Sequence, residues 1–198
     1  MTYREERAVQ VLDYLANKLM GKRLSKLNAL KLVYLADRYH LRKYGMPILR
    51  DEYYAMNYGP VASRTKRLIE QIGKDPSITD FISVERGSRR TSSGRDVMYI
   101  ASVRKPNLEQ LSKTEVQALN VALTQWPLHD DLVRFTHLFP EWKSAESRLK
   151  AGASRVKMEY LDFFKPCPEG EYCDADDELV EMNRQVFEEE RPFLFGRQ

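Results

Sequence analysis

The sequence lacks a hydrophobic run long enough to cross a membrane. Charged residues interrupt every apolar stretch of the 198-residue chain well before the ~20 residues that a transmembrane helix requires. The first residues, MTYREERAVQ, are also too charged for a secretory signal peptide. We therefore expect a cytoplasmic protein.

Cysteine is scarce, with only Cys167 and Cys173 in the segment PCPEGEYC. The pair could close a small loop in an oxidising compartment, but nothing else in the chain indicates export, so we expect free thiols. A zinc site usually needs four ligands, and the nearby candidates are only the carboxylates Glu169, Glu171 and Asp174. We expect neither a metal nor another cofactor.

The chain also lacks the short motifs of common enzymes. It has no P-loop, no dinucleotide-binding fingerprint, no kinase signature and no Gly-x-Ser-x-Gly elbow. Its histidines, His40, His129 and His137, are not spaced as metal ligands. We expect no catalytic activity, although Asp37, His40, Tyr58 and His137 could converge in a pocket and would then reopen the enzyme hypothesis.

The composition is that of a folded, soluble protein with an uneven charge distribution. Hydrophobic residues make up 42% of the chain and charged residues 31%, and the net charge is +3. Residues 1–105 hold 21 Lys and Arg against 11 Asp and Glu, whereas residues 106–198 hold 11 against 18. The acidic excess lies in residues 166–198, which we interpret either as a solvated helix or as a charged contact arm.

Two helices are predicted at the start of the chain. The spacing of apolar residues predicts the first over EERAVQVLDYLANKLM, ending at Gly21. The second begins after the N-cap Ser25 and runs to Tyr44, with Gly45 as the C-terminal stop and Pro47 beyond it. Apolar residues cover more than half of the second helix, so it should lie at the centre of a bundle.

The middle of the chain should contain a β insertion at about 78–105. FISVER and DVMYIASV read as the two strands of a hairpin, and residues 53–57 could add a third. Between these regions, Pro60 is a natural first residue for a helix through VASRTKRLIEQIG.

Helices resume after Pro106. A capping box formed by Ser112 and Glu115 predicts a helix start. Further helices are predicted in HDDLVRFTHLF, PEWKSAESRLKAG, SRVKMEYLDFF and DELVEMNRQVFEEE. The fold class is therefore mainly α (α+β), a helical bundle around a central helix with a small antiparallel β-hairpin or three-stranded sheet. We divide it into a helical domain, 1–165, and an acidic loop and helix extension, 166–198.

Asp37 is the most unusual residue of the central helix, because it lies in an apolar stripe with Leu30, Tyr34 and Leu41. A buried carboxylate needs partners. We expect either His40 or the free N–H groups at the start of the Pro60 helix. Asp37 would then be a structural clasp, or would help to shape a binding surface.

Basic residues cluster at two places, and both could contact a partner or a nucleic acid. The clusters lie at a helix start and in the hairpin loop, and comprise Arg64, Lys66, Arg67, Arg86, Arg89, Arg90 and Arg95. Such clusters bind phosphates in a salt-dependent way, so a nucleic-acid-binding regulator is the alternative function.

Three motifs along the chain can be read together. The first is carried by Leu30, Lys31, Leu32, Tyr34, Ala36, Asp37, His40, Leu41, Gly45 and Pro47. The second is carried by Asp51, Ala55, Tyr58, Gly59, Pro60 and Val61. The third is carried by Leu111, Ser112, Glu115, Leu132, Thr136, His137 and Trp142. In this order they resemble the Panacea domain, the SocA-like antitoxin family of bacterial toxin–antitoxin loci and prophages, over about Ala8 to Lys165.

The resemblance implies a protein that binds and neutralises a cognate protein toxin, or delivers it as an adaptor to a protease such as a AAA+ system. The motif residues would form a structural clasp or binding surface, namely Tyr34, Asp37, His40, Tyr58, Gly59, Pro60, His137 and Trp142. The loop GSRRTSSGR and the tail after Lys165 lie outside the motifs. We expect those two segments to select the partner.

Overall fold

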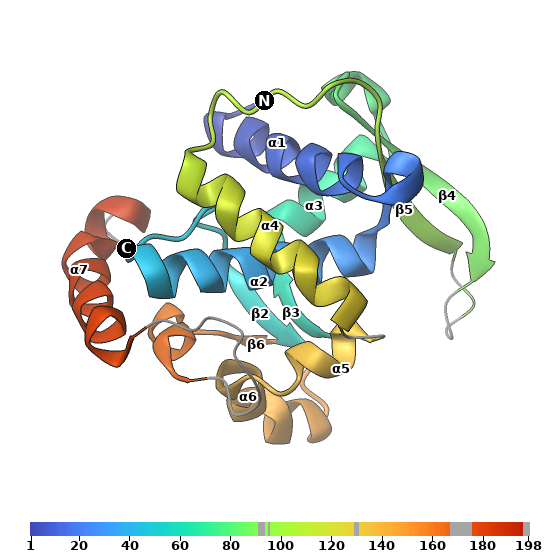
Figure 1. The fold of residues 1–198 in the computed structure, drawn as a ribbon. Helices are drawn as coiled ribbons and strands as arrows, with labels where there is room; N and C mark the ends of the chain where they lie inside the picture. The colour runs from blue at the N-terminus through green and yellow to red at the C-terminus, as the bar shows by residue number, and fades with distance from the viewer. Residues whose placement is uncertain (91–93, 95, 129–130, 167–175, 196–198) are drawn as a thin grey trace.

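Helix α2, Lys26–Tyr44, runs through the centre of the molecule in the computed structural model, which describes residues 1–198 except 91–93, 95, 129–130, 167–175 and 196–198 (Figure 1). Every α2 residue from 29 to 42 is buried. The Ser25 side chain accepts a hydrogen bond from the Asn28 N–H at 3.3 Å, and Gly45 ends the helix in the left-handed conformation. The predicted bounds and central position of this helix are confirmed.

The other helices surround α2. They are α1 Tyr3–Asn17, α3 Ser63–Ile72, α4 Lys113–Leu128, α5 Leu132–Thr136, α6 Pro140–Lys150 and α7 Asp177–Phe195. In Figure 1, α1 and α4 cover one side of α2, whereas α5 and α6 lie on the other. The predicted capping box is present, since the Ser112 N–H donates to Glu115 Oε2 and the Glu115 N–H donates to Ser112 Oγ.

Two small antiparallel sheets complete the fold. One has the order β1–β5–β4, with β1 Arg23–Ser25, β4 Ile82–Arg90 and β5 Asp96–Ser102. The other has the order β3–β2–β6, with β2 Tyr53–Met56, β3 Gly59–Ala62 and β6 Val156–Lys157. The β4–β5 hairpin and the mainly α (α+β) class are confirmed. The third strand beside the hairpin is β1, so the placement of residues 53–57 there was wrong.

The start of the predicted Pro60 helix was also wrong. Pro60 lies within β3, opposite Ala55, and the helix begins three residues later at Ser63. β3 is an edge strand, where a proline without an N–H group can be accommodated. The local signal for a helix start was overridden by pairing with β2.

A second correction concerns SRVKMEYLDFF. This segment forms β6 and a 3₁₀ turn, Tyr160–Phe164, instead of an α-helix. β6 pairs with β2 through the partners Tyr54↔Lys157 and Ala55↔Val156. The 3₁₀ turn places its aromatic side chains in the core, where Phe163 is fully buried.

Helix α7 extends beyond the predicted segment and lies against the C-terminal end of α2 (Figure 1). The Asn183 side chain donates to the Arg42 carbonyl at 2.9 Å, and Phe187 is fully buried. One face of α7 is thus packed on the core, while its other faces meet solvent. Cys167 and Cys173 lie outside the described residues. None of the described helices has the length and apolarity needed to cross a bilayer.

Candidate binding surface

Asp37 is 1% exposed and holds the loop that follows α2. Its Oδ1 accepts hydrogen bonds from the backbone N–H groups of Ile48 and Leu49 at 2.7 and 3.1 Å, and its Oδ2 accepts one from the Tyr53 hydroxyl at 2.9 Å. Burial raises the pKa of Asp37 to about 7, against the effect of these donors. Neither predicted partner was right, because the sequence could not reveal that the chain folds back over α2.

The start of α3 is capped by Asp51 instead. Asp51 accepts hydrogen bonds from the backbone N–H groups of Arg64 and Thr65, both at 2.8 Å, and from the Thr65 hydroxyl at 2.7 Å. These bonds satisfy donors that the first turn of a helix leaves unpaired. Asp51 therefore fills the position that the sequence analysis gave to Asp37.

Lys31 is a buried cation that sequence reasoning missed. Its Nζ donates to the Pro60 carbonyl at 2.8 Å, and burial lowers its pKa to about 7. A methyl group on Gly59 would lie 2.7 Å from Thr136 Oγ1 and 2.8 Å from Lys31 Nζ. Gly59 also has a φ of 90°, so this position requires glycine both for its backbone conformation and for the lack of space. Nothing in the sequence signalled the burial of Lys31, because a lysine in a helix usually extends to solvent.

The same β2–β3 turn is bordered by α5 and α6. His137 stacks on Trp142 with ring centroids 3.6 Å apart, and the Trp142 Nε1–H donates to the Met56 carbonyl at 3.0 Å. Burial, followed by the positive charge of Lys31, lowers the pKa of His137. Tyr58, at the tip of the turn, is 58% exposed. Gly59, Pro60, His137 and Trp142 are thus brought together, with Tyr58 presented to solvent.

Tyr34 and His40 occupy separate places along α2. The Tyr34 hydroxyl donates to Glu141, which also forms a fully buried ion pair with Arg38 at 2.7 Å. His40 lies nearer the C-terminal end, where its Nδ1 is 2.6 Å from the Met46 carbonyl and its Nε2 is 3.1 Å from the Thr114 hydroxyl. These groups join α2 to α6 and α4. The sequence analysis missed the burial of Arg38, because arginine is usually exposed.

Asp37, His40 and His137 have separate partners. Asp37 bonds to the loop after α2, His40 to Met46 and Thr114, and His137 stacks on Trp142. In the part of the chain that the structure describes, no group of three or more His, Cys, Asp or Glu side chains is arranged to hold a metal ion. The geometry therefore indicates that these three side chains hold loops and a turn in place.

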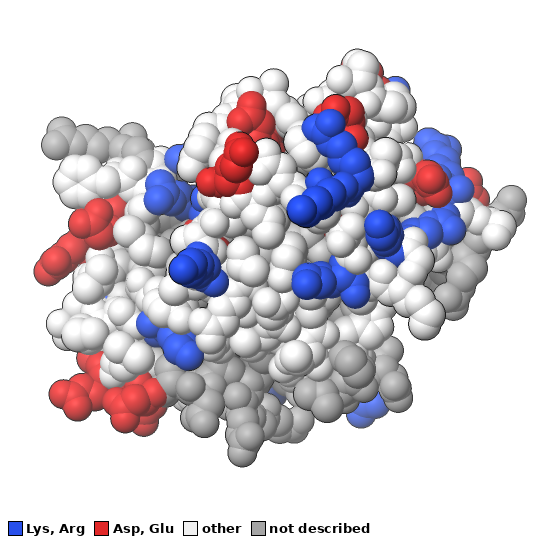
Figure 2. All heavy atoms as spheres, turned by 45° about the horizontal axis from the view of Figure 1, so that its top comes forward, with Lys and Arg blue, Asp and Glu red and all other residues white. Residues whose placement is uncertain are grey.

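The basic residues of α3 are only partly available to a partner. Arg64 pairs with Glu52 at 2.7 Å and Lys66 with Glu70 at 3.1 Å, whereas Arg67 is exposed and forms no ion pair with a described residue. Arg86 is exposed on β4, the side chains of Arg89 and Arg90 are not described, and Arg95 lies outside the described residues. On the face that Figure 2 shows, positive groups are scattered among negative and uncharged ones, without a continuous basic stripe among the described residues.

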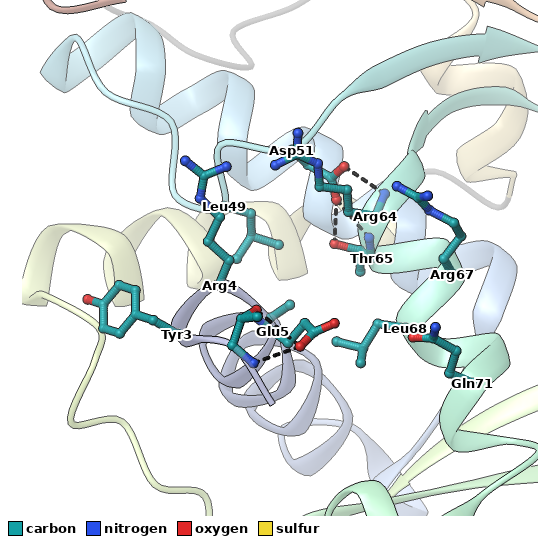
Figure 3. Close-up of a pocket in the computed structure, with 12 residues that line it drawn as sticks. Tyr3, Arg4, Glu5, Leu49, Asp51, Arg64, Thr65, Arg67, Leu68 and Gln71 are labelled. Atoms are coloured by element: carbon teal, nitrogen blue, oxygen red, sulfur yellow. Dashed lines mark hydrogen bonds between the residues drawn. The ribbon is translucent and has the colours of Figure 1, made fainter. Parts of the chain in front are cut away.

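A hollow of about 640 Å³ opens beside Arg67, between α3 and the N-terminal end of α1 (Figure 3). Arg4 and Arg67 lie on opposite sides of it, and Leu68 and Leu49 contribute apolar surface. Sequence reasoning named Arg64 and Arg67 but missed Arg4, because nothing local indicates that the chain's first turn lies beside α3.

These features define a class of protein: a small α+β protein built on one buried helix, whose polar side chains fix the loops around it. The family model described as antitoxin SocA-like, Panacea domain, matches residues 30–143. Because this match covers more than half of the chain, the protein belongs to that family. The resemblance is confirmed, although the match is shorter than Ala8 to Lys165 and includes the GSRRTSSGR loop. Comparisons with curated proteins and with solved structures found no match.

Proposed function

We propose that the protein is an antitoxin that binds a cognate protein toxin and neutralises it by protein–protein contact, without catalysis or a cofactor. The observation that carries the proposal is the family match over residues 30–143. This range includes α2 from Leu30 onward, the β2–β3 turn and the β4–β5 hairpin.

The rescue of growth tests the proposal. Each open reading frame beside the gene is expressed from an inducible promoter, with and without this protein. We expect one neighbour to arrest growth and this protein to relieve the arrest. Absence of any toxic neighbour, or arrest that persists during co-expression, would contradict the proposal and direct attention to DNA retention at the gene's own promoter.

Two routes to neutralisation can then be separated. An antitoxin that masks the toxin leaves its cellular half-life unchanged, whereas an adaptor for a AAA+ protease shortens it. We propose masking as the primary route, because inhibition by contact requires no additional component. Rescue that disappears in a strain lacking the protease would contradict masking and support delivery.

A further inference from the structure

The hollow between α1 and α3 has an apolar floor. Ala8, Leu49 and Leu68 line it and belong to the hydrophobic core, with exposed fractions of 5%, 6% and 3%. Figure 3 shows the hollow bordered by the first turn of α1 on one side and by α3 on the other. Its volume of about 640 Å³ is large enough for several side chains of a bound chain.

A second depression, of about 370 Å³, adjoins the hollow and shares Glu5, Leu68 and Gln71 with it. These two depressions form a groove, which we call the α1–α3 groove. An elongated groove fits an extended chain segment better than a compact small molecule.

Positive charge is more available than negative charge at the centre of this groove. Glu5 accepts hydrogen bonds from the Thr2 backbone and hydroxyl, and Asp51 caps α3, so both carboxylates face their own N–H and O–H donors (Figure 3). Arg4 donates to the Leu194 carbonyl, a neutral acceptor. Arg67 is exposed and forms no ion pair with a described residue. The nearby Glu52 is paired with Arg64, which lowers the pKa of Glu52, and the charge of Arg67 helps to lower it. The two guanidinium groups can therefore donate hydrogen bonds to carboxylates of a ligand.

We infer that the α1–α3 groove binds an acidic segment of the partner protein, in which carboxylates flank an apolar side chain. The carboxylates pair with Arg4 and Arg67, and the apolar side chain packs on Leu49 and Leu68. That the partner is a protein toxin rests on the proposed function. The new element is the surface that binds the toxin and the kind of segment that this surface recognises.

The apolar floor favours a peptide over a nucleic acid. Nucleic-acid grooves follow the phosphate backbone with a row of cations and use aromatic platforms for the bases. Here Arg4 and Arg67 lie on opposite sides of buried aliphatic groups, and exposed Tyr3 is the one aromatic side chain among the described residues that line the central hollow. An apolar side chain of a peptide that is seated on this floor would be removed from water, which contributes hydrophobic free energy that phosphate contacts cannot supply.

Fluorescence anisotropy with the full-length protein tests the groove directly. The probe is a labelled peptide of about a dozen residues in which Asp and Glu surround one Leu. We expect Arg67→Glu to weaken its binding by about tenfold or more at low salt. Arg148→Glu, the same charge change at an exposed site on α6, is the matched control and should leave binding within about twofold. Replacing the peptide's Asp and Glu by Asn and Gln should remove binding.

Three results would overturn the inference: no peptide binding, equal loss with Arg67→Glu and Arg148→Glu, or tighter Arg67-dependent binding of a labelled oligothymidylate of equal charge. The peptide assay needs no toxin, so it is independent of whether the antitoxin function is right. In the growth assay, Arg67→Glu should lose rescue and Arg148→Glu should keep it. Rescue by both variants would reject the groove while leaving the antitoxin function intact.

Discussion

At the scale of single residues, the buried carboxylate of Asp37 makes a testable contribution to stability. Asp37→Ala should lower the free energy of unfolding by ~3–5 kcal/mol, because it leaves three donors in the interior without their acceptor. Urea unfolding measures this change. Asp37→Asn is the control, since it retains one oxygen acceptor at nearly the same volume and should cost less. An unchanged unfolding midpoint for Asp37→Ala would contradict the structural role.

The raised pKa of Asp37 also predicts a pH dependence. Its pKa is 3.8 in ordinary surroundings and about 7 in the fold, so the folded state binds more protons between these values. Stability must therefore fall as the pH rises from about 4 to about 7, by up to roughly 4 kcal/mol from this group. The difference in unfolding free energy between wild type and Asp37→Asn should decline over that range. A constant difference would contradict the raised pKa.

Lys31 predicts the opposite slope at higher pH. Its pKa is lowered from 10.5 to about 7, so the unfolded state binds more protons over this range and stability should rise with pH. Lys31→Met removes the titrating group while keeping most of the side-chain volume. The stability of the wild type relative to this variant should rise from pH 7 to 10, measured by chemical unfolding. A flat difference would mean that Lys31 remains fully charged in the fold.

Gly59 allows the steric and conformational costs at the β2–β3 turn to be separated. Gly59→Ala should lower the free energy of unfolding by roughly 1–2 kcal/mol because of the positive φ, and by roughly 1–3 kcal/mol more because of the contacts with Thr136 and Lys31. Gly152→Ala is the matched control, because Gly152 has a φ of 101° but no neighbour within 4 Å of an added methyl group. Equal losses in thermal unfolding would contradict the tight packing at Gly59.

At the scale of helices and strands, the packing of α7 decides whether residues 166–198 fold with the rest. Phe187 is fully buried, and the centroid of its ring lies 5.6 Å from the ring centroid of Tyr160 and 5.8 Å from that of Phe164. Phe187→Ala should therefore cost ~3–5 kcal/mol in a single unfolding transition. Met182→Ala, at a 54% exposed site on the same helix, should change stability by at most about 0.5 kcal/mol. A separate early transition, alone affected by Phe187→Ala, would instead identify 166–198 as an independent extension.

The elements that could be predicted from the sequence are those defined by local signals. Ser25 and Gly45 mark the ends of α2, and Ser112 with Glu115 marks the start of α4; each acts within one helical turn. The position of Pro60 in a strand could not be predicted, because it depends on pairing with Ala55 and on the edge position of β3. Nonlocal pairing likewise turned the segment at β6 away from a helix.

The candidate site was less predictable than the fold. Asp37 could be identified from its place in an apolar stripe, but its partners Ile48, Leu49 and Tyr53 depend on how the chain folds back. Lys31 sits in a similar apolar setting, yet lysine normally extends to solvent and gives no signal of burial. Residues that act through distant contacts require the tertiary structure.

At the scale of the whole molecule, the proposed function requires a direct complex between this protein and a toxin. The most direct measurement is co-purification: the neighbour-encoded protein that arrests growth is co-expressed with this protein, which carries a removable tag, and the eluate is analysed by size-exclusion chromatography with light scattering. We expect a single species whose mass is that of a complex containing both chains, and we expect this complex to be lost with Arg67→Glu but not with Arg148→Glu. Rescue of growth without any complex between the purified proteins would contradict neutralisation by contact.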